Sequence, residues 1–266
     1  MNEMAIGRMS LINEADRYLT IAVDSYDNWE IKGVIFQGES SHGTMFGGFT
    51  EMIMNMDHLF DSVGAPKQTF QMRCLSGSDP MDFKMQRMKR ADRMGKLKTI
   101  RICLRFRYHA SWQGTMIWDD GNRTASFDSE LQFIMITNAI LQEDVCEGDK
   151  AIANILDPEF FENWSLSLSG DYMDISMTEG ADILSGIDYG RLISSEASEE
   201  FIRTGQKASF SVKVMFREHN TWQGMIYWRE GKVQQTFRSF KEMLYMISSV
   251  VKLTLAEGEP MAAGKS

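Results

Sequence analysis

Paired cysteines, prolines and long apolar runs are all scarce in this chain. Its three cysteines, Cys74, Cys103 and Cys146, stand singly and form neither a CxxC pair nor an even disulfide framework. Single cysteines are typical of a protein whose thiols stay reduced. No stretch approaches the roughly eighteen apolar residues of a membrane span, and no basic segment followed by an apolar run lies near Met1. We therefore expect a cytoplasmic protein without a membrane partner.

Motifs of the common enzyme classes are also missing. The chain contains no GxxxxGKS/T or GxGxxG phosphate loop, no HExxH or paired CxxC metal motif, and no GxSxG nucleophile motif. We accordingly predict no cofactor and no metal ion. A binding function is favoured over an enzymatic one.

Charge is distributed unevenly along the chain. The net charge is −9, yet residues 84–107 contain ten Lys or Arg and one acid, whereas residues 142–200 contain fifteen Asp or Glu and two bases. The negative total argues against a protein that coats nucleic acid wholesale. The two blocks either neutralise each other within the fold or present oppositely charged surfaces to partners.

One nine-residue segment occurs twice. Phe-Arg-x-His-x-x-Trp-Gln-Gly spans residues 106–114 and again residues 216–224, and the register then holds through a second Trp, a Gly, a Phe and a Ser. The matching downstream residues are Trp118 and Trp228, Gly121 and Gly231, Phe127 and Phe237, and Ser129 and Ser239. A spacing kept over more than twenty residues indicates one structural unit used twice.

Each copy has the pattern of three strands followed by a helix. Apolar and polar residues alternate over 100–107 and 210–217, as in a half-buried strand. A turn leads to a second strand, and Gly and Asn within 119–122 favour a hairpin into a third. Ser129 and Ser239 then begin helices, each with Gln or Glu three residues on, as in a capping box.

The N-terminal region matches the same unit more loosely. With Gly33 as the equivalent of Gly114, Phe46 follows at the same distance as Phe127, and Gly48 replaces the serine. Trp-Gln-Gly and the second Trp are missing. An apolar stripe at helical spacing follows, formed by Met52, Ile53, Met56, Leu59 and Phe60. We predict an α+β fold of three βββα units, the first divergent and the other two forming a pseudo-symmetric pair.

The connector after the first unit has its own signals. Residues 70–74 alternate as in a short strand, and a helix over 80–94 is indicated by Asp79 and Pro80 at its start and Gly95 after its end. That helix would carry Met on one face and Lys and Arg elsewhere. It could dock an acidic partner, but burial against the first unit is favoured.

The predicted organisation has six parts. They are a divergent unit (1–64), a connector (65–97), a second unit (98–141), an acidic insertion (142–206), a third unit (207–255) and a disordered tail (256–266). Within the insertion, residues 164–168 have the alternation of a strand.

The duplicated pattern, with its later Trp and Phe-x-Ser-x-x-Glu, resembles a family of uncharacterised proteins from clostridial (Firmicutes) bacteria. The likeness covers the second and third units well, the first in part, and neither connector. Because that family has no established activity, the resemblance implies a cytosolic bacterial protein and no particular chemistry.

His109 and His219 occupy the same place in the two copies. Units packed about a pseudo-twofold axis would bring them together, where they could hold zinc with further ligands or act as a general base. A zinc site needs about four ligands, and neither copy supplies a Cys or carboxylate at a set spacing. The favoured interpretation is that each imidazole hydrogen-bonds a turn.

The repeated tryptophans are expected to pack. In each copy two Trp lie six residues apart on one strand and share a face, with a Gly between them. These residues are Trp112, Trp118, Trp222 and Trp228. A Gly between large aromatics admits a neighbouring ring or backbone, which favours packing over a ligand platform.

The first strand of the second unit carries arginines on one face. The residues that we expect to face the helix are Ile100, Ile102, Leu104 and Phe106. The residues that we expect to point away are Arg101, Arg105 and Arg107. Such a face resembles a platform for single-stranded nucleic acid, with Tyr227 as the exposed aromatic that the pattern offers. The slightly favoured alternative is that the acidic insertion covers it.

The sequence thus favours a non-catalytic binding or scaffolding protein in a cytosolic protein complex. Nucleic-acid binding through the arginine face is the alternative, and an enzyme or metal site on the histidine pair is third. Candidate binding residues are those that packing does not explain. They are Arg107, His109 and Gln113 with their counterparts Arg217, His219 and Gln223, and Arg101, Arg105 and Tyr227 on the strand faces.

Overall fold

A computed structural model describes residues 17–77, 79, 84–142, 145–157 and 207–258. Their contacts divide the chain into two compact units. The first unit comprises residues 1–69, 84–108 and 112–127, and the second comprises residues 70–83, 109–111 and 128–266. The chain therefore passes between the units several times.

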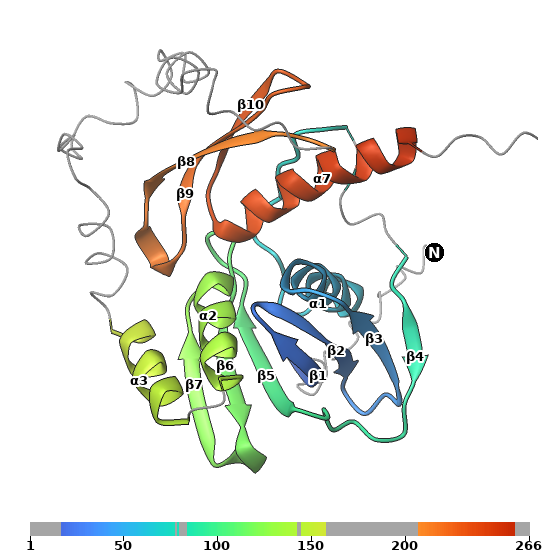
Figure 1. Ribbon diagram of the computed structural model, residues 1–266, viewed down its shortest axis with the longest axis vertical. Helices are drawn as coiled ribbons and strands as arrows, with labels where there is room; N and C mark the ends of the chain where they lie inside the picture. The colour runs from blue at the N-terminus through green and yellow to red at the C-terminus, as the bar shows by residue number, and fades with distance from the viewer. Residues whose placement is uncertain (1–16, 78, 80–83, 143–144, 158–206, 259–266) are drawn as a thin grey trace, which may run out of the picture. The chain divides into compact units, whose positions relative to one another are not determined.

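The first unit is built on a seven-stranded antiparallel sheet with strand order β4-β3-β2-β1-β5-β6-β7 (Figure 1). Its strands are β1 (Tyr18–Asp27), β2 (Glu30–Gln37), β3 (His42–Phe46), β4 (Arg87–Lys89), β5 (Lys98–Phe106), β6 (Gln113–Trp118) and β7 (Arg123–Phe127). Helix α1 (Phe49–Val63) packs on β2 and β3, and all five residues of its expected apolar stripe are buried. The stripe supplies the hydrophobic contact that holds the helix on the sheet.

The centre of this sheet is the antiparallel pair β1–β5. Thr20 lies opposite Arg101, and both residues stand thirteen positions before a glycine, Gly33 or Gly114, that begins the same pattern. Leu19 opposite Ile102 mirrors Ile21 opposite Ile100. The pairing is therefore symmetric about Thr20 and Arg101, as it is when two equivalent strands meet across a twofold axis.

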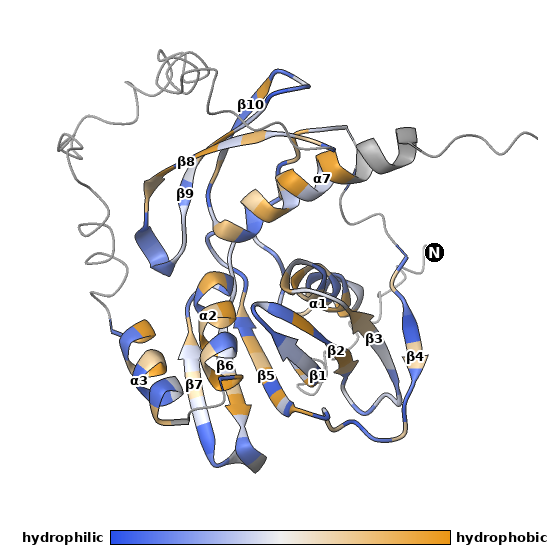
Figure 2. Ribbon diagram, in the orientation of Figure 1, coloured by the Kyte–Doolittle hydropathy of each residue, from blue (hydrophilic) through white to orange (hydrophobic). Residues whose placement is uncertain are grey.

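The second unit contains a three-stranded sheet with strand order β10-β9-β8. Its elements are α2 (Glu130–Ile140), α3 (Val145–Ile155), β8 (Phe210–Phe216), β9 (Gln223–Trp228), β10 (Val233–Phe237) and α7 (Phe240–Gly258). Helix α2 contacts α3 and α7, and α7 contacts β10. Apolar and polar residues alternate over residues 240–251 of α7 (Figure 2). Its apolar residues join a core cluster of Leu75, Ile226, Phe237, Met243, Met246 and Val250.

A glycine faces a phenylalanine at the same place in each meander. The three pairs are Gly33 with Phe46, Gly114 with Phe127, and Gly224 with Phe237. A Cβ on any of these glycines would collide with the ring of its phenylalanine and with a backbone oxygen of the preceding strand. The ring thus occupies the space that a side chain would need, which explains the glycine.

The three helices that follow the meanders also begin in the same way. In each helix, the side chain three residues after the N-cap accepts a hydrogen bond. The donor is the backbone N–H of the residue just before the N-cap. The bonds run from Gly47 to Glu51 (2.8 Å), from Asp128 to Gln132 (2.8 Å) and from Arg238 to Glu242 (2.7 Å). Ser129 and Ser239 also cap their helices, each accepting from an N–H at 3.0 Å. The serine half of each predicted capping box is therefore formed, whereas the Gln or Glu side chain bonds the N–H one residue before the cap and not that of the cap itself.

The structure confirms a mixed α+β fold with a large antiparallel sheet, but corrects the connector. Over residues 84–94 there is no helix: Arg87–Lys89 form β4, which pairs with β3. Met88 packs on Ala22, Val34 and Phe36, an apolar cluster on one face of the sheet. Pairing with the edge of β3 and packing of Met88 on this cluster stabilise a strand here more than the local sequence stabilises a helix.

Residues 70–74 also differ from the prediction, because they form no strand. Arg73 instead hydrogen-bonds Glu242 at the start of α7. Helix α7 ends at Gly258, beyond the predicted end of the third unit at residue 255. The expected strand at 164–168 lies outside the described residues.

A membrane-spanning helix would need a long apolar segment. None of the helices in the described ranges is long and apolar enough to cross a membrane.

Candidate functional site

The repeated glutamine fixes the turn of its own motif. Gln113 accepts a hydrogen bond from the N–H of Tyr108 (3.0 Å) and donates one to its carbonyl (3.2 Å). Gln223 makes the same two bonds with Glu218, at 3.0 and 2.7 Å. Each side-chain amide thus pairs with backbone groups of the turn that no strand pairs with, which accounts for the repeated spacing without any ligand.

The two motif histidines come together in the second unit. The rings of His109 and His219 stack with centroids 4.3 Å apart and planes 11° apart. Both residues have positive φ, 54° and 55°, and both are exposed. The lone pair of an imidazole nitrogen lies in the ring plane, so parallel stacked rings do not converge on one ion between them. Among the described residues, no group of three or more metal-ligating side chains is found.

Reciprocal hydrogen bonds hold these two histidine turns. Ser239, the cap of α7, donates to the carbonyl of Ala110 (2.7 Å), and Ser129, the cap of α2, donates to the carbonyl of Asn220. Each turn is thereby tied to the helix of the other copy. The position of the histidines follows from this exchange of capping contacts.

Arg107 does not point away from the helix, so that expectation was wrong. Its side chain is 1% exposed and forms ion pairs with Asp57 (2.9 Å) and Asp61 (2.5 Å) of α1. Trp112 donates from its indole N–H to the same Asp57 at 2.7 Å. The cause is a β-bulge between Leu104 and Phe106, which shifts the alternation by one residue.

The same bulge turns Phe106 outward. Phe106 is 48% exposed, although it was expected to face the helix, and Tyr108 is 47% exposed. Their rings stack on each other with centroids 5.2 Å apart and planes 12° apart. Two large aromatic side chains are thus presented to solvent side by side at the end of β5.

A cavity of about 600 Å³ adjoins this aromatic pair. Besides Phe106 and Tyr108, its lining includes Arg17, Lys67 and Arg105. None of these three cations forms an ion pair with any described residue. We call the five residues the basic–aromatic patch.

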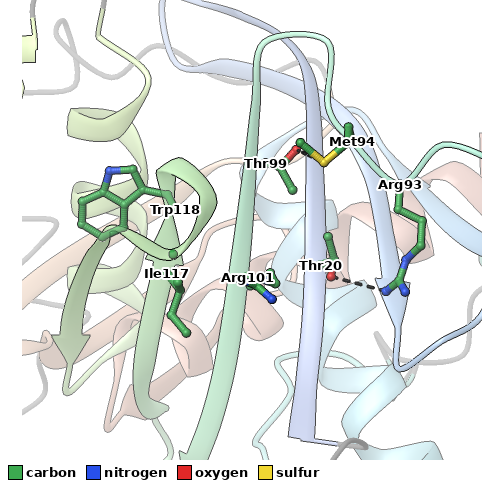
Figure 3. Close-up of a pocket in the computed structure, with 8 residues that line it drawn as sticks. Thr20, Arg93, Met94, Thr99, Arg101, Ile117 and Trp118 are labelled. Carbon is green, nitrogen blue, oxygen red and sulfur yellow. Dashed lines mark hydrogen bonds between the residues drawn. The ribbon is translucent and has the colours of Figure 1, made fainter.

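A second cavity of about 350 Å³ lies further along β5 (Figure 3). Arg101 and Thr20 line it from neighbouring strands, and Arg93 reaches Thr20 with a hydrogen bond of 3.4 Å. Arg101 is exposed and, like Arg105, alternates with buried Ile102 and Leu104. Arg101 and Arg105 therefore lie on one face of β5, and this pair behaves as the sequence pattern predicts.

The remaining candidate residues lie elsewhere. Tyr227 is half-buried on β9 of the three-stranded sheet, and Arg217 is half-buried before the turn that carries His219. Trp112 and Trp118 are buried, whereas Trp222 and Trp228 pack at the margin of the core cluster of the second unit. Residues 158–206 of the acidic insertion lie outside the described residues, so the expected cover over the arginine face is not placed.

The sequence pattern missed most of the basic–aromatic patch. Phe106 was assigned to the buried face because the bulge is not visible in an alternating pattern, and Arg17 and Lys67 come from distant segments. One signal was present in the sequence. The second copy reads Arg105-Phe106-Arg107-Tyr108, whereas the third reads Met215-Phe216-Arg217-Glu218, so only the second copy combines the extra cation and the second ring.

Cys74 is not an activated nucleophile. Cys74, Cys103 and Cys146 are free thiols. Burial raises the pKa of the Cys74 thiol, and the charges of Asp79 and Glu242 raise it further. A raised pKa keeps the thiol protonated and unreactive near neutral pH.

Comparison of the chain with protein-family models, with curated proteins and with solved structures finds no match.

Proposed function

We propose that this chain is a non-catalytic binding protein that binds single-stranded nucleic acid along β5. The observation that carries the proposal is the exposed stack of Phe106 and Tyr108 beside Arg17, Lys67 and Arg105. Bases stack on exposed aromatic rings, and each such contact contributes about 1–3 kcal/mol. Cations that form no ion pair with the described residues are available to bind the phosphates between the bases.

The arginines of β5 extend this site along the strand. Arg101 and Arg105 are four residues apart on one face, which corresponds to about 13 Å of strand. Arg93 lines the cavity beside Arg101. A strand of nucleic acid that stacks on the aromatic pair would meet these guanidinium groups next. Such recognition depends on shape and charge and is tolerant of sequence.

Three copies of one βββα unit form the scaffold for this site in our proposal. The shared glycine–phenylalanine pairs, the bulges and the helix starts support a common unit. The motif residues Gln113, Gln223 and Arg107 serve packing and turns, so they need no catalytic role. The resemblance to clostridial proteins and the three free cysteines support a cytosolic bacterial setting.

The test is fluorescence anisotropy with a labelled oligothymidylate of about 12 nucleotides, within the usual site sizes. We expect binding at low salt, with a slope of log K against log salt of roughly −2 to −3 for about four phosphate contacts. Phe106→Ala and Arg105→Glu should each weaken binding about tenfold or more.

Matched controls come from the chain itself. Phe216 is the equivalent of Phe106 without the cations, so Phe216→Ala should leave the affinity unchanged. Lys150→Glu reverses an exposed charge on α3 and should also have little effect. Absence of binding at low salt, or equal affinities for Phe106→Ala and wild type, would overturn the proposal.

A scaffolding role in a protein complex is the second candidate. Met94 and Leu97 are 51% and 49% exposed, close in sequence to the exposed Lys96. Adaptable apolar side chains among cations suit an acidic protein partner. Purification of the protein from its native cells should then return one partner at near-equal amount, and its absence would count against this role.

A further inference from the structure

Strand β8 has an outer edge that no described residue pairs with. It is the last strand of the order β10-β9-β8, and its only ladder in the described part of the chain is with β9. An edge strand presents unpaired N–H and C=O groups, which makes it a template for another strand. Proteins normally protect such edges with prolines, charges or short strands. β8 is seven residues long, with no proline and a single charge, Lys213.

One apolar side chain of β8 is exposed where the equivalent residue of β5 is buried. Val212 is 44% exposed, whereas Ile102, which stands twelve positions before Gly114 as Val212 does before Gly224, is 0% exposed. The difference has a local cause: Ile102 lies opposite Leu19 of β1, and Val212 has no such neighbour in the described residues.

Another strand of the chain shows how an edge of this kind is paired. In the seven-stranded sheet, β5 pairs through the same edge with β1, and the two strands occupy equivalent positions before Gly114 and Gly33. The pairing is symmetric about Thr20 and Arg101. Two strands of this type are therefore complementary to each other along this edge.

We propose that β8 pairs antiparallel with β8 of a second copy of this chain. The residue equivalent to Thr20 and Arg101 is Ser211, thirteen positions before Gly224. Ser211 therefore faces Ser211 of the second copy on the twofold axis. Val212 then lies opposite Phe210 of that copy, which reproduces the contact of Ile102 with Leu19.

Charge and backbone both permit this interface. In the proposed register Lys213 faces Ser209 of the second copy, so no like charges lie opposite each other. The bulge between Val214 and Phe216 lies beyond the central pairs, as the bulge between Leu104 and Phe106 does in β5. The result is an isologous dimer with a continuous six-stranded sheet, and it does not depend on the proposed nucleic-acid site.

The first experiment measures the mass of the full chain in solution by analytical ultracentrifugation over a range of concentrations. We expect a monomer–dimer equilibrium. Val212→Asp should raise the dimer dissociation constant at least tenfold because it places a charge against an apolar partner. Met45→Asp, at an apolar residue of β3 in the first unit that is 41% exposed, should leave the constant unchanged.

The second experiment does not depend on weakening the fold. Opposed residues of antiparallel strands have Cα atoms about 4.5–5.5 Å apart, within the range of a disulfide. In a chain with Cys74, Cys103 and Cys146 changed to Ser, Ser211→Cys should give a covalent dimer on oxidation. The matched change Gln235→Cys on β10 should not.

Two results would overturn the proposal. One is a chain that stays monomeric at its highest soluble concentration. This result includes the case in which another segment of the same chain, such as residues 164–168, pairs with this edge and protects the amides of β8 from hydrogen exchange. The other is a dimer that Val212→Asp leaves intact and Ser211→Cys does not cross-link.

Discussion

The meander β5–β6–β7 and the meander β8–β9–β10 have the same register, the same bulge and the same glycine, but different neighbours. The first continues through β1 into a seven-stranded sheet, whereas the second ends at β8 within the described residues. Ile102 is consequently buried and Val212 is 44% exposed. The repeated sequence determines the shape of a meander, and the strand beside it determines what that meander exposes.

The end of the first strand shows the same difference in charge. Arg107 is buried against two aspartates of α1, while Arg217 is half-buried in the second unit. Tyr108 stacks on Phe106, but the equivalent residue of the third copy is Glu218, which would repel a phosphate. One motif thus serves packing in both places and leaves a candidate binding surface in only one.

Replacing Arg107 and Arg217 should give the largest difference in stability between the two copies of the motif. Arg107→Met leaves Asp57 buried without its cation, and we expect a loss of about 3–5 kcal/mol in the free energy of unfolding. Arg217→Met should cost clearly less, because Arg217 is only half-buried. Chemical unfolding followed by circular dichroism compares the two variants. Equal losses in the free energy of unfolding would show that the two arginines do not differ in their contribution to stability.

Substitution of the shared glycines should show where the copies are alike. Gly33→Ala, Gly114→Ala and Gly224→Ala each force a Cβ into a phenylalanine ring and a backbone oxygen, so each should destabilise by about 1–3 kcal/mol. Gly77→Ala is the control, because a Cβ there meets no atom within 4 Å. Tolerance at any one of the three sites would show that its meander packs differently.

Glu242 makes the free energy of unfolding depend on pH, whereas its counterpart Gln132 carries no group that titrates. Burial by itself would raise the pKa of Glu242, but hydrogen bonds from Arg238 and Arg73 hold it below the ordinary value of 4.5. A depressed pKa contributes stability above the unfolded-state value that is lost as the pH falls below about 4.5. We expect Glu242→Gln to remove this acid-sensitive part and to cost about 1–3 kcal/mol at pH 7.

Acid titration of the unfolding free energy measures this effect. Gln fits the position, since Gln132 makes the same backbone bond in α2. An unchanged pH profile in the Glu242→Gln variant would show that the carboxylate does not contribute.

The helix caps should give the smallest effects. Ser129→Ala and Ser239→Ala each remove a cap and a bond to the opposite histidine turn, so each should cost about 1 kcal/mol. Gly48→Ser adds the missing cap of α1 in open space and should stabilise by a few tenths of a kcal/mol. Thermal unfolding resolves the direction, and a destabilising Gly48→Ser would show that α1 begins differently.

Much of the local structure could be predicted because short-range rules govern it. The capping serines, the Gly–Phe spacing and the apolar stripe of α1 all depend on residues close in sequence, and all three are present in the structure. The same rules predict a helix over 80–94. That prediction is wrong, because residues 87–89 pair with β3 as a strand. Local preference decides a segment only where no stronger partner is available.

The candidate site shows the same limit. Arg101 and Arg105 followed from alternation, whereas Phe106 and Arg107 were placed on the wrong faces because one extra residue in the ladder reverses every side chain beyond it. Arg17 and Lys67 could not be placed near Tyr108 from the sequence, because only the folded chain brings those segments together.

The spacing of neighbouring residues is enough to predict the mixed α+β class, the meanders and their glycines, and the helix starts. The tertiary structure alone decided that β1 pairs with β5, that Arg107 is neutralised by α1, and that Phe106 and Tyr108 face solvent. These outcomes depend on contacts between distant segments, whose energies no local pattern contains. The edge of β8 that no described residue pairs with is recognised for the same reason, by comparison with the equivalent edge of β5, which pairs with β1.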